Sequence, residues 1–397
     1  MKAYVFLSFF FFLLSQTGAD INTFINEKSC DSKCTFSTRE LTTKTMEHFP
    51  KTFSTVCSEL LINEMCYLSE DQITFLFSNM KKLIGSLTVI HTNYTSAKFL
   101  AGLESIECGN DSETTLVDNN EMLELGLLNL NTINCKGFTV SGNKKLEKLN
   151  MPNIKNMTNP SDPTKKVDIS ISSDLPSFCI CTHEMYNFMS IDTADNYFIS
   201  GNYCEPILDN QLCKEPTNGC TQLFGNIEIG TDFDLESIKS VETIFGNLVI
   251  NGSDLTNLEC FESLKYVAEL GNKPAIIIDR NEKLTNFTFP KLRRIHSDAI
   301  EIMSFKNSIF LSIHNFTLCF EIRKFLDLRG LAPTFDGFSC GRHTFSSFSR
   351  RRFSRVARSR VKITKLEQKN RRRELCKRLV VLVDGIFCNV SGLNLIS

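Results

Sequence analysis

The chain has 397 residues, of which 42% are hydrophobic and 22% are charged, and its formal net charge is −1. This length suits two domains of ordinary size rather than one. A domain of roughly 130 residues buries more than about 60% of its surface, which excludes a small scaffold held together by cysteines alone. Charge is uneven, because residues 341–397 hold 15 Lys or Arg and 3 Asp or Glu, which leaves 29 basic and 42 acidic residues elsewhere.

Residues 1–19 have the layout of a secretory signal peptide. Lys2 supplies a positive charge, residues 5–14 form an apolar run, and residues 17–19 suit cleavage before Asp20. The run is too short to span a bilayer, which takes roughly 20 apolar residues. We therefore expect a secreted, extracellular protein that folds in an oxidising compartment.

Cysteines and glycosylation sequons agree with that location. The 16 cysteines are an even number, which suits disulfide bonds in such a compartment. N-x-Ser/Thr sequons lie at Asn93, Asn110, Asn156, Asn251, Asn286, Asn315 and Asn389. A glycan is bulky and needs water around it, so we expect Asn93, Asn251 and Asn286 at exposed corners next to strands.

A first domain is predicted over residues 57–204, after a lead-in at 20–56 that contains Cys30 and Cys34. Its strands are predicted at 60–62, 87–90, 116–117 and 138–140. Ser69 and Glu70 suit the start of a helix over 69–76. Residues 156–177 are rich in Pro, Ser, Asp and Asn, which predicts a surface loop.

A linker is predicted over 205–219 and a second domain over 220–340, in which one short pattern recurs four times. Three-residue strands with apolar ends are predicted at 227–229, 248–250, 276–278 and 300–302. Steps of 20–29 residues with one strand each are typical of a solenoid. One coil cannot bury its own apolar edge, so neighbouring coils have to stack and share a core.

The same block occurs in the first domain at an offset of 161 residues. Gly85 falls on Gly246 and Leu87 on Leu248, and residues 117–123 fall on residues 278–284 without a gap. This register through strand, turn and lead-in predicts an internal duplication.

The segment Cys220-Thr-Gln-Leu-Phe-Gly-Asn-Ile-Glu-Ile resembles the receptor L domain, the ligand-binding module of insulin-receptor-like and epidermal-growth-factor-receptor-like proteins. Asn-x-x-Leu turns, such as Asn120 to Leu123 and Asn281 to Leu284, and the Pro290-x-Leu292-x-x-Ile295 step are also similar to that family. The resemblance covers roughly residues 57–340. It implies a mainly β fold with two tandem short right-handed β-helices, which are leucine-rich-repeat-like solenoids, and a few helices at their ends.

The resemblance further implies a disulfide between Cys319 and Cys340, because the cysteine of the family's last coil bonds to one about twenty residues on. By analogy we expect Cys181 to pair with Cys204, and we also expect a Cys213–Cys220 bond. Cys108 and Cys135 lie one coil apart, and adjacent coils allow the Cα separation of under about 7 Å that a disulfide needs.

Cys260 has no obvious partner, so a free thiol is expected there. Cys179, Cys181 and His183 raise the alternative of a metal site, but zinc sites usually contain Cys-x₂-Cys pairs, so disulfides are favoured and no metal is expected. The six histidines show no His-Glu-x-x-His spacing, and Gly-x-Ser-x-Gly and P-loop motifs are absent from the sequence. We expect neither catalysis nor a cofactor.

By the resemblance, ligand would bind the outward side of one sheet in the first domain, where the matching positions are Ile90 and Asn119. An exposed Ile is a weak sign of a contact surface, and an ordinary surface is the alternative. The sequence shows no transmembrane run or kinase motif after Cys340. We expect a secreted protein that binds an insulin-like or growth-factor-like polypeptide without signalling itself. The alternative is a structural or adhesive extracellular protein with homophilic or matrix contacts.

Residues 341–397 form a basic tail with the clusters Arg350-Arg351-Arg352 and Arg371-Arg372-Arg373. In a cytosolic protein such clusters would indicate nucleic acid. Behind a signal peptide, the alternatives are attraction to polyanionic glycans, a processing-protease site, or a disordered solvated tail. No nucleic-acid partner is expected.

Overall fold

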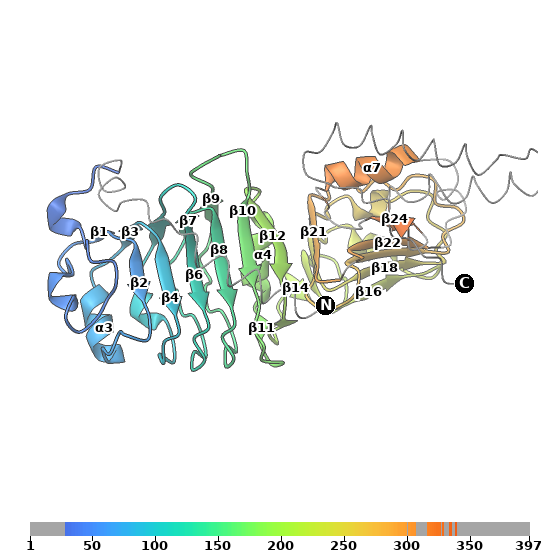
Figure 1. Ribbon diagram of the computed structural model, residues 1–397. Coiled ribbons are helices and arrows are strands. Elements are labelled where there is room, and N and C mark those ends of the chain that lie inside the picture. The colour runs from blue at the N-terminus through green and yellow to red at the C-terminus, as the bar shows by residue number, and fades with distance from the viewer. Residues whose placement is uncertain are drawn as a thin grey trace, which may run out of the picture. The chain divides into compact units, whose positions relative to one another are not determined.

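The computed structural model describes residues 28–299, 301–306, 316–326, 328, 333–335 and 338–339, all of which belong to one compact unit that ends at Cys340. The predicted signal peptide and the predicted tail lie outside the described residues, as do Asn315, Cys340 and Asn389. Parallel strands dominate the described part, and they form two stacks of coils (Figure 1). This arrangement fits a β-helix-like fold, and the right-handed winding stays a prediction.

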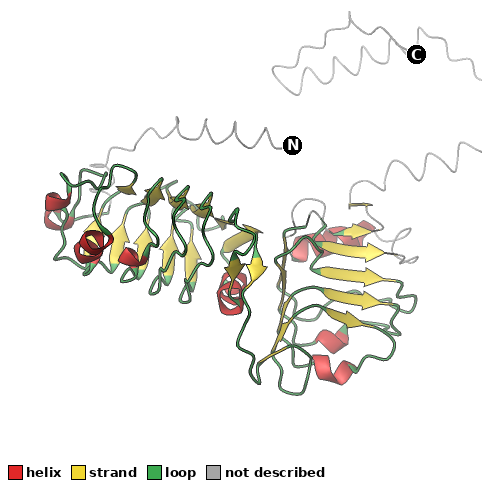
Figure 2. Ribbon diagram, turned by 90° about the horizontal axis from the view of Figure 1, so that it is seen from below, coloured by secondary structure: helices red, strands yellow, loops and turns green. Residues whose placement is uncertain are grey.

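The first stack contains two main parallel sheets and one short strand pair. The five-stranded sheet contains β1 (Thr55–Cys57), β3 (Lys82–Ile84), β5 (Ser105–Glu107), β7 (Thr132–Asn134) and β9 (Asn156–Thr158). The six-stranded sheet contains β2 (Leu60–Ile62), β4 (Leu87–Ile90), β6 (Glu113–Val117), β8 (Gly137–Ser141), β10 (Val167–Ile171) and β12 (Ala194–Ile199). The short pair is β11 (Cys179–Ile180) with β13 (Asn202–Tyr203). Figure 2 shows these strands side by side along the row of coils.

The second stack repeats this arrangement. Its five-stranded sheet contains β14 (Leu212–Cys213), β15 (Gln222–Phe224), β17 (Thr243–Phe245), β19 (Tyr266–Glu269) and β21 (Arg294–Ser297). Its six-stranded sheet contains β16 (Ile227–Ile229), β18 (Leu248–Asn251), β20 (Ile276–Asp279), β22 (Met303–Lys306), β23 (Thr334–Phe335) and β24 (Phe338–Ser339). Only the β23–β24 pair is antiparallel among the described strands.

Short helices complete the coils. Among the described residues, the α-helices are α3 (Glu70–Phe77), α4 (Thr182–Ser190), α5 (Leu235–Ile238) and α7 (Phe316–Phe325), and the 3₁₀ turns are η1 (Ser32–Cys34), η2 (Met46–His48), η3 (Lys98–Leu100) and η4 (Glu259–Phe261). The predicted start of α3 is confirmed, because the Ser69 hydroxyl accepts a bond from the backbone N–H of Gln72 and the side-chain Oε1 of Gln72 accepts one from the backbone N–H of Ser69. This capping box satisfies two N–H groups that a helix start otherwise leaves unpaired.

Alternation of apolar residues explains which side of each main strand is buried. In β2, β4 and β18 the first and third residues are buried and the second is half-exposed. Strand side chains point to opposite faces in turn, so each coil contributes a pair of apolar side chains to the interior. The strands predicted at 60–62, 87–90, 227–229, 248–250 and 276–278 are therefore confirmed.

Two predictions about strand position are wrong, and a short strand lies within the predicted linker at 205–219. The fourth strand of the second stack is β22 at Met303–Lys306 rather than 300–302, because Met303 pairs with Ile276 in the ladder. The predicted loop at 156–177 contains β9 and β10, whose buried residues Met157, Val167 and Ile171 complete a coil. The predicted linker contains β14, which pairs with β15.

The predicted lead-in is part of the folded structure. Phe36, Leu41 and Phe49 are buried in the core of the first stack, and a disulfide joins Cys30 to Cys57 on β1. An open end of a solenoid exposes apolar side chains, so a terminal segment has to cover it. The segment before β1 therefore caps the first coil.

The two stacks are joined by a polar and aromatic contact that involves α4 and β21. The Arg294 guanidinium donates to three carbonyl oxygens at the end of α4: Phe188 at 3.3 Å, Ile191 at 2.9 Å and Asp192 at 3.2 Å. The last carbonyls of a helix have no partner within the helix, and a cation there also meets the negative end of the helix dipole. Arg294 therefore caps a helix of the first stack from the second.

Aromatic side chains surround this joint. The Tyr203 hydroxyl donates to the carbonyl oxygen of Ala268 at 2.8 Å, and its ring lies edge-on to Phe245 at 5.6 Å. Nε2 of His296 lies 2.8 Å from the carbonyl oxygen of Ile199, and this ring is only 2% exposed. His296 is therefore a buried part of this joint. The first core includes Phe245, Tyr266, Ala268 and Leu270 of the second stack, so the joint is continuous with a hydrophobic core.

Candidate functional site

The outer side of the six-stranded sheet in the first stack is the candidate binding surface, and we call it the first face. Its central column, one residue from each strand in register, is Leu61, Thr88, Thr115, Thr139, Ser170 and Phe198. Most of these side chains are half-exposed, and Phe198 is 60% exposed. Short hydroxyl side chains thus lie between two larger apolar ones on a parallel sheet.

A second column of the first face runs along the strand ends. Ile90 pairs in register with Val117, and Val117 pairs with Ser141. Ile90 is half-exposed and Val117 is 8% exposed, so this column adds a small apolar area. The structure therefore places the predicted residue Ile90 on the first face.

Charged groups flank both edges of the first face. At one corner the imidazole of His91 lies 3.9 Å from a Glu64 carboxylate oxygen and 3.6 Å from an Asp118 oxygen. At the other end of the strands, one register position is occupied in turn by Glu113 on β6, Gly137 on β8, Asp168 on β10 and Asp195 on β12. Burial raises the pKa of the Glu113 carboxyl, with Lys136 opposing the shift and Asp168 adding to it. The surroundings of the first face are therefore acidic.

Asn119, the other predicted contact residue, does not reach the surface. It is fully buried, and its Oδ1 accepts bonds from the N–H and the hydroxyl of Thr92 at 3.0 and 2.7 Å. Its Nδ2 donates to the carbonyl oxygens of Val89 and Val117 at 3.0 and 3.1 Å. A buried amide with this many bonds holds the corner of a coil, so the prediction of a ligand contact at Asn119 is wrong.

The same buried asparagine recurs in neighbouring coils and in the other stack. Asn143 accepts from the N–H of Asn119 at 2.8 Å and donates to the carbonyl of Leu116. Asn281 accepts from the N–H and hydroxyl of Ser253 and donates to the carbonyls of Ile250 and Asp279. We call these residues the asparagine ladder. Asn143 and Asn281 each begin an Asn-x-x-Leu turn of the sequence, whereas Asn119 is followed by Met122, so the expected turn from Asn120 to Leu123 is one residue out of frame.

The ladder corrects the alignment between the two halves. Asn119 and Asn281 have the same partners and Met122 and Leu284 are both buried, which corresponds to an offset of 162 residues. Leu123, which the gapless alignment places on Leu284, is 42% exposed. The second stack thus has one extra residue between β19 and β20, and the expectation of no gap is wrong.

Most of the predicted glycosylation sites lie at the surface. Asn93, Asn110, Asn156 and Asn286 are exposed, and Asn251 at the end of β18 is half-exposed. Each of these side chains is therefore accessible to water, as an attached glycan requires. Occupancy of the sites stays a prediction.

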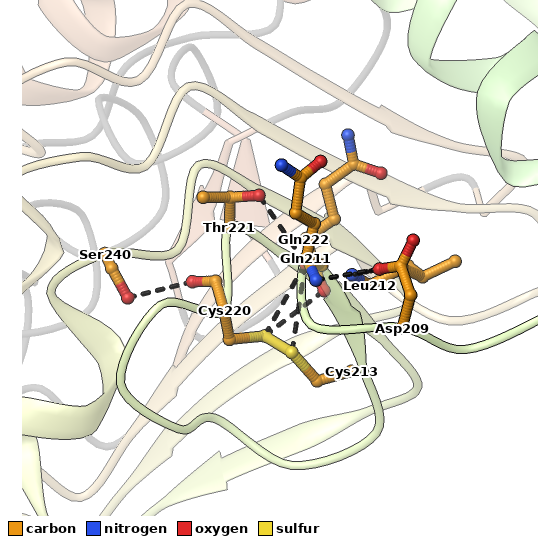
Figure 3. Close-up of a disulfide and its surroundings, with 8 residues drawn as sticks. All are labelled: Asp209, Gln211, Leu212, Cys213, Cys220, Thr221, Gln222 and Ser240. Carbon is orange, nitrogen blue, oxygen red and sulfur yellow. Dashed lines mark hydrogen bonds between the residues drawn. A yellow bond between two sulfur atoms is a disulfide. The ribbon is translucent and has the colours of Figure 1, made fainter.

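Disulfides hold successive coils at several points. Cys108–Cys135 and Cys213–Cys220, two of the expected pairs, are present. Figure 3 shows the second of them. Beside the second of them, Asp209 Oδ1 accepts from the N–H groups of Gln211 and Leu212 at 2.7 Å each. These bonds position β14 against β15.

The expected Cys181–Cys204 pair is wrong, because Cys204 bonds to Cys179. Cys179 and Asn202 pair in the β11–β13 ladder, whereas Cys181 already lies at the start of α4. Cys181 is free, as are Cys260, which was expected, and the buried Cys34 and Cys66. Cys319 is disulfide-bonded, and its expected partner Cys340 lies outside the described residues.

Serine variants of Cys179 and Cys181 are expected to differ sharply. Cys179→Ser opens a loop with a sequence separation of 25, which should lower the free energy of unfolding by about 3 kcal/mol. Cys181→Ser should keep every disulfide of the wild type. Burial, with Glu184 adding to it, raises the pKa of the Cys181 thiol to about 11, so this thiol is a poor attacking group at neutral pH. Non-reducing peptide mapping and urea unfolding measure both effects. A Cys181–Cys204 peptide in the wild type would contradict this assignment.

No helix among the described residues is long and apolar enough to cross a membrane.

Two residues were missed by the sequence reasoning. Phe198 was missed because strand β12 was not predicted, and Arg294 was missed because basic residues in a short strand are usually solvated.

Comparison with known proteins gives two matches. The family described as "Receptor L domain" matches residues 59–157 and 219–326, which together make up more than half of the chain. The Caenorhabditis elegans protein irld-34 is 23% identical over 242 residues, which cover 56% of this chain and 55% of that protein. The chain therefore spans about half the length of this curated relative.

Proposed function

Because the chain belongs to the receptor L domain family, a family of ligand-binding extracellular modules, we propose that it is a secreted binding protein for an extracellular polypeptide. It captures an insulin-like or growth-factor-like ligand at equilibrium and does not signal itself. The observation that carries this proposal is the first face: six parallel strands hold one ordered column of outward side chains.

The composition of the first face supports a protein ligand. Protein interfaces gain most of their binding energy from a few aromatic or large apolar side chains within a less energetic surround. Phe198 is 60% exposed at one end of the column, and Ile90 and Leu61 are half-exposed toward the other. The threonines between them have short side chains, so binding orders few rotatable bonds.

The charges around the first face favour a ligand with basic side chains. Glu64 and Asp118 lie at one edge, and Glu113 and Asp168 lie at the opposite ends of the strands. Opposite charges at the rim of an interface mainly raise the association rate and exclude wrong partners. Binding should therefore weaken as salt screens these charges.

The disulfides and the exposed sequons support an extracellular location. Four disulfides connect described cysteines, and such bonds persist in oxidising compartments. The described asparagines of the sequons are exposed or half-exposed. Both features are expected of a protein that passes through the secretory route.

Calorimetric titration of the secreted protein against a panel of insulin-like and growth-factor-like peptides tests the proposal. We expect at least one peptide to bind at micromolar concentration or below. Thr115→Arg, in the middle of the column, and Phe198→Ala, at its end, should each weaken that binding at least about tenfold, or ~1.4 kcal/mol.

Ser105→Arg on β5 is the matched control, because Ser105 is half-exposed on the other sheet of the same stack. It should leave the affinity unchanged. Absence of any binder at micromolar concentration would contradict the proposal. A constitutive large dimer in sedimentation, with no peptide bound, would favour an adhesive role through homophilic contacts.

A further inference from the structure

The second stack has a surface equivalent to the first face, and we call it the second face. It is the outer side of the neighbouring strands β16, β18 and β20, the first two of which are labelled side by side in Figure 1. Its outward residues are Glu228, Val249, Ile277, Asn251 and Asp279. Val249 takes the position of Thr88, and Ile277 takes that of Thr115. The two halves therefore present the same scaffold with different side chains.

The difference at the end of the central strand is chemically specific. Ile90 ends β4 on the first face, and Asn251 ends β18 at the same register position. Asn251, Gly252 and Ser253 form a glycosylation sequon. An apolar contact residue in one half is thus replaced by the asparagine of a glycosylation sequon in the other.

The hydrogen bonds of Asn251 are compatible with an attached sugar. Its Nδ2 donates to Glu228 Oε1 at 2.9 Å, and its Oδ1 accepts from Arg280 Nη2 at 3.0 Å. An amide nitrogen has two hydrogens, and N-linkage replaces one of them. The other hydrogen still bonds to Glu228, so both interactions survive and fix the direction in which the sugar leaves the sheet.

We propose that an N-linked glycan on Asn251 covers the second face and leaves the first face as the protein-binding surface of the molecule. This inference rests on the proposed extracellular location. Val249 lies two residues before Asn251 on the same side of β18, about 7 Å away, and Ile277 lies on the adjacent strand about 4.8 Å from Val249. The first sugars of the glycan therefore extend over two half-exposed apolar side chains.

Covering this strip has a physical benefit. Exposed apolar residues that adjoin on a regular sheet invite association with other proteins, whereas a glycan keeps them in a hydrated surround. Asn93 and Asn286 are exposed at coil corners outside the strands, so sugars there leave both strand columns open. Of the described sequons, Asn251 alone ends a strand of a six-stranded sheet.

The test uses the full chain secreted from eukaryotic cells. Glycopeptide mass mapping should find Asn251 occupied. Hydroxyl-radical footprinting then compares the wild type with Asn251→Gln and with the enzymatically deglycosylated protein. In both unglycosylated forms we expect oxidation of Val249 and Ile277 to rise several-fold, while oxidation of Leu61 and Ile90 stays constant.

Asn286→Gln is the matched control, because it removes a sugar from an exposed corner of the same stack and should leave Val249 and Ile277 unchanged. The proposal is overturned if Asn251 is unoccupied while Asn93 or Asn286 carries a glycan, or if loss of the Asn251 glycan leaves the footprint of Val249 and Ile277 as it was. A secreted protein with no glycan at any sequon overturns it too. None of these outcomes removes peptide binding by the first face, and a failed peptide screen leaves the Asn251 result standing.

Discussion

Asn119→Ala should lower the free energy of unfolding by about 3–5 kcal/mol, because it leaves several buried groups without partners. The variant removes the acceptor for the N–H and hydroxyl of Thr92 and the donor to the carbonyls of Val89 and Val117. All four groups lie at a buried corner, where water cannot replace the lost bonds. Urea unfolding followed by circular dichroism measures the change.

Asn120→Ala is the matched control, because Asn120 is the next residue and is exposed. Surface substitutions of this kind usually change stability by less than about 0.5 kcal/mol. Asn281→Ala should repeat the large effect in the second stack, since Asn281 has the equivalent partners. Equal small losses for Asn119→Ala and Asn120→Ala would refute the role of the asparagine ladder.

Arg294→Met should cost about 3–5 kcal/mol, since methionine retains much of the side-chain volume but removes the guanidinium that donates to the carbonyls of Phe188, Ile191 and Asp192. The Ile191 carbonyl still accepts from the backbone N–H of Ala194. These carbonyls lie at the end of α4, beside the aromatic contact of Tyr186 with Tyr266. The loss should therefore loosen the joint as well as the helix end. Differential scanning calorimetry should show one transition in the wild type and two in the variant.

Arg293→Met provides the control for this joint. Arg293 directly precedes Arg294 in the chain, and its side chain is exposed. Its replacement should therefore leave a single unfolding transition at nearly the wild-type temperature. If Arg294→Met also retains a single unshifted transition, the joint does not couple the two stacks.

The sequence predicted the repeated coils well, because each strand needs apolar residues at alternating positions and this pattern is local. Leu87, Leu248 and Ile276 each begin a strand with that alternation. The prediction failed at 300–302, although Ile-Glu-Ile has that alternation. The position of β22 depends on pairing with Ile276 and on the length of the intervening turn. Such long-range hydrogen bonds outweigh a local pattern, which therefore misplaced the strand by three residues.

The candidate site was predicted only in part for a related reason. Ile90 follows from strand alternation, but Phe198 belongs to a strand preceded by a polar segment and a helix. Asn119 was assigned to the binding surface because it matches a contact position of the family, whereas the ladder buries it. The joint at Arg294 depends on contacts between residues about 100 positions apart, which a one-chain pattern does not contain.

The extra residue between β19 and β20 shows how this architecture tolerates changes in chain length. Both stacks keep the same strand pairing and the same buried corner on either side of that difference. The bend therefore accommodates an added residue and leaves the strand columns undisturbed. Segments grafted at such bends, for example near residues 109–112, would vary the margin of a recognition surface while its centre stays constant.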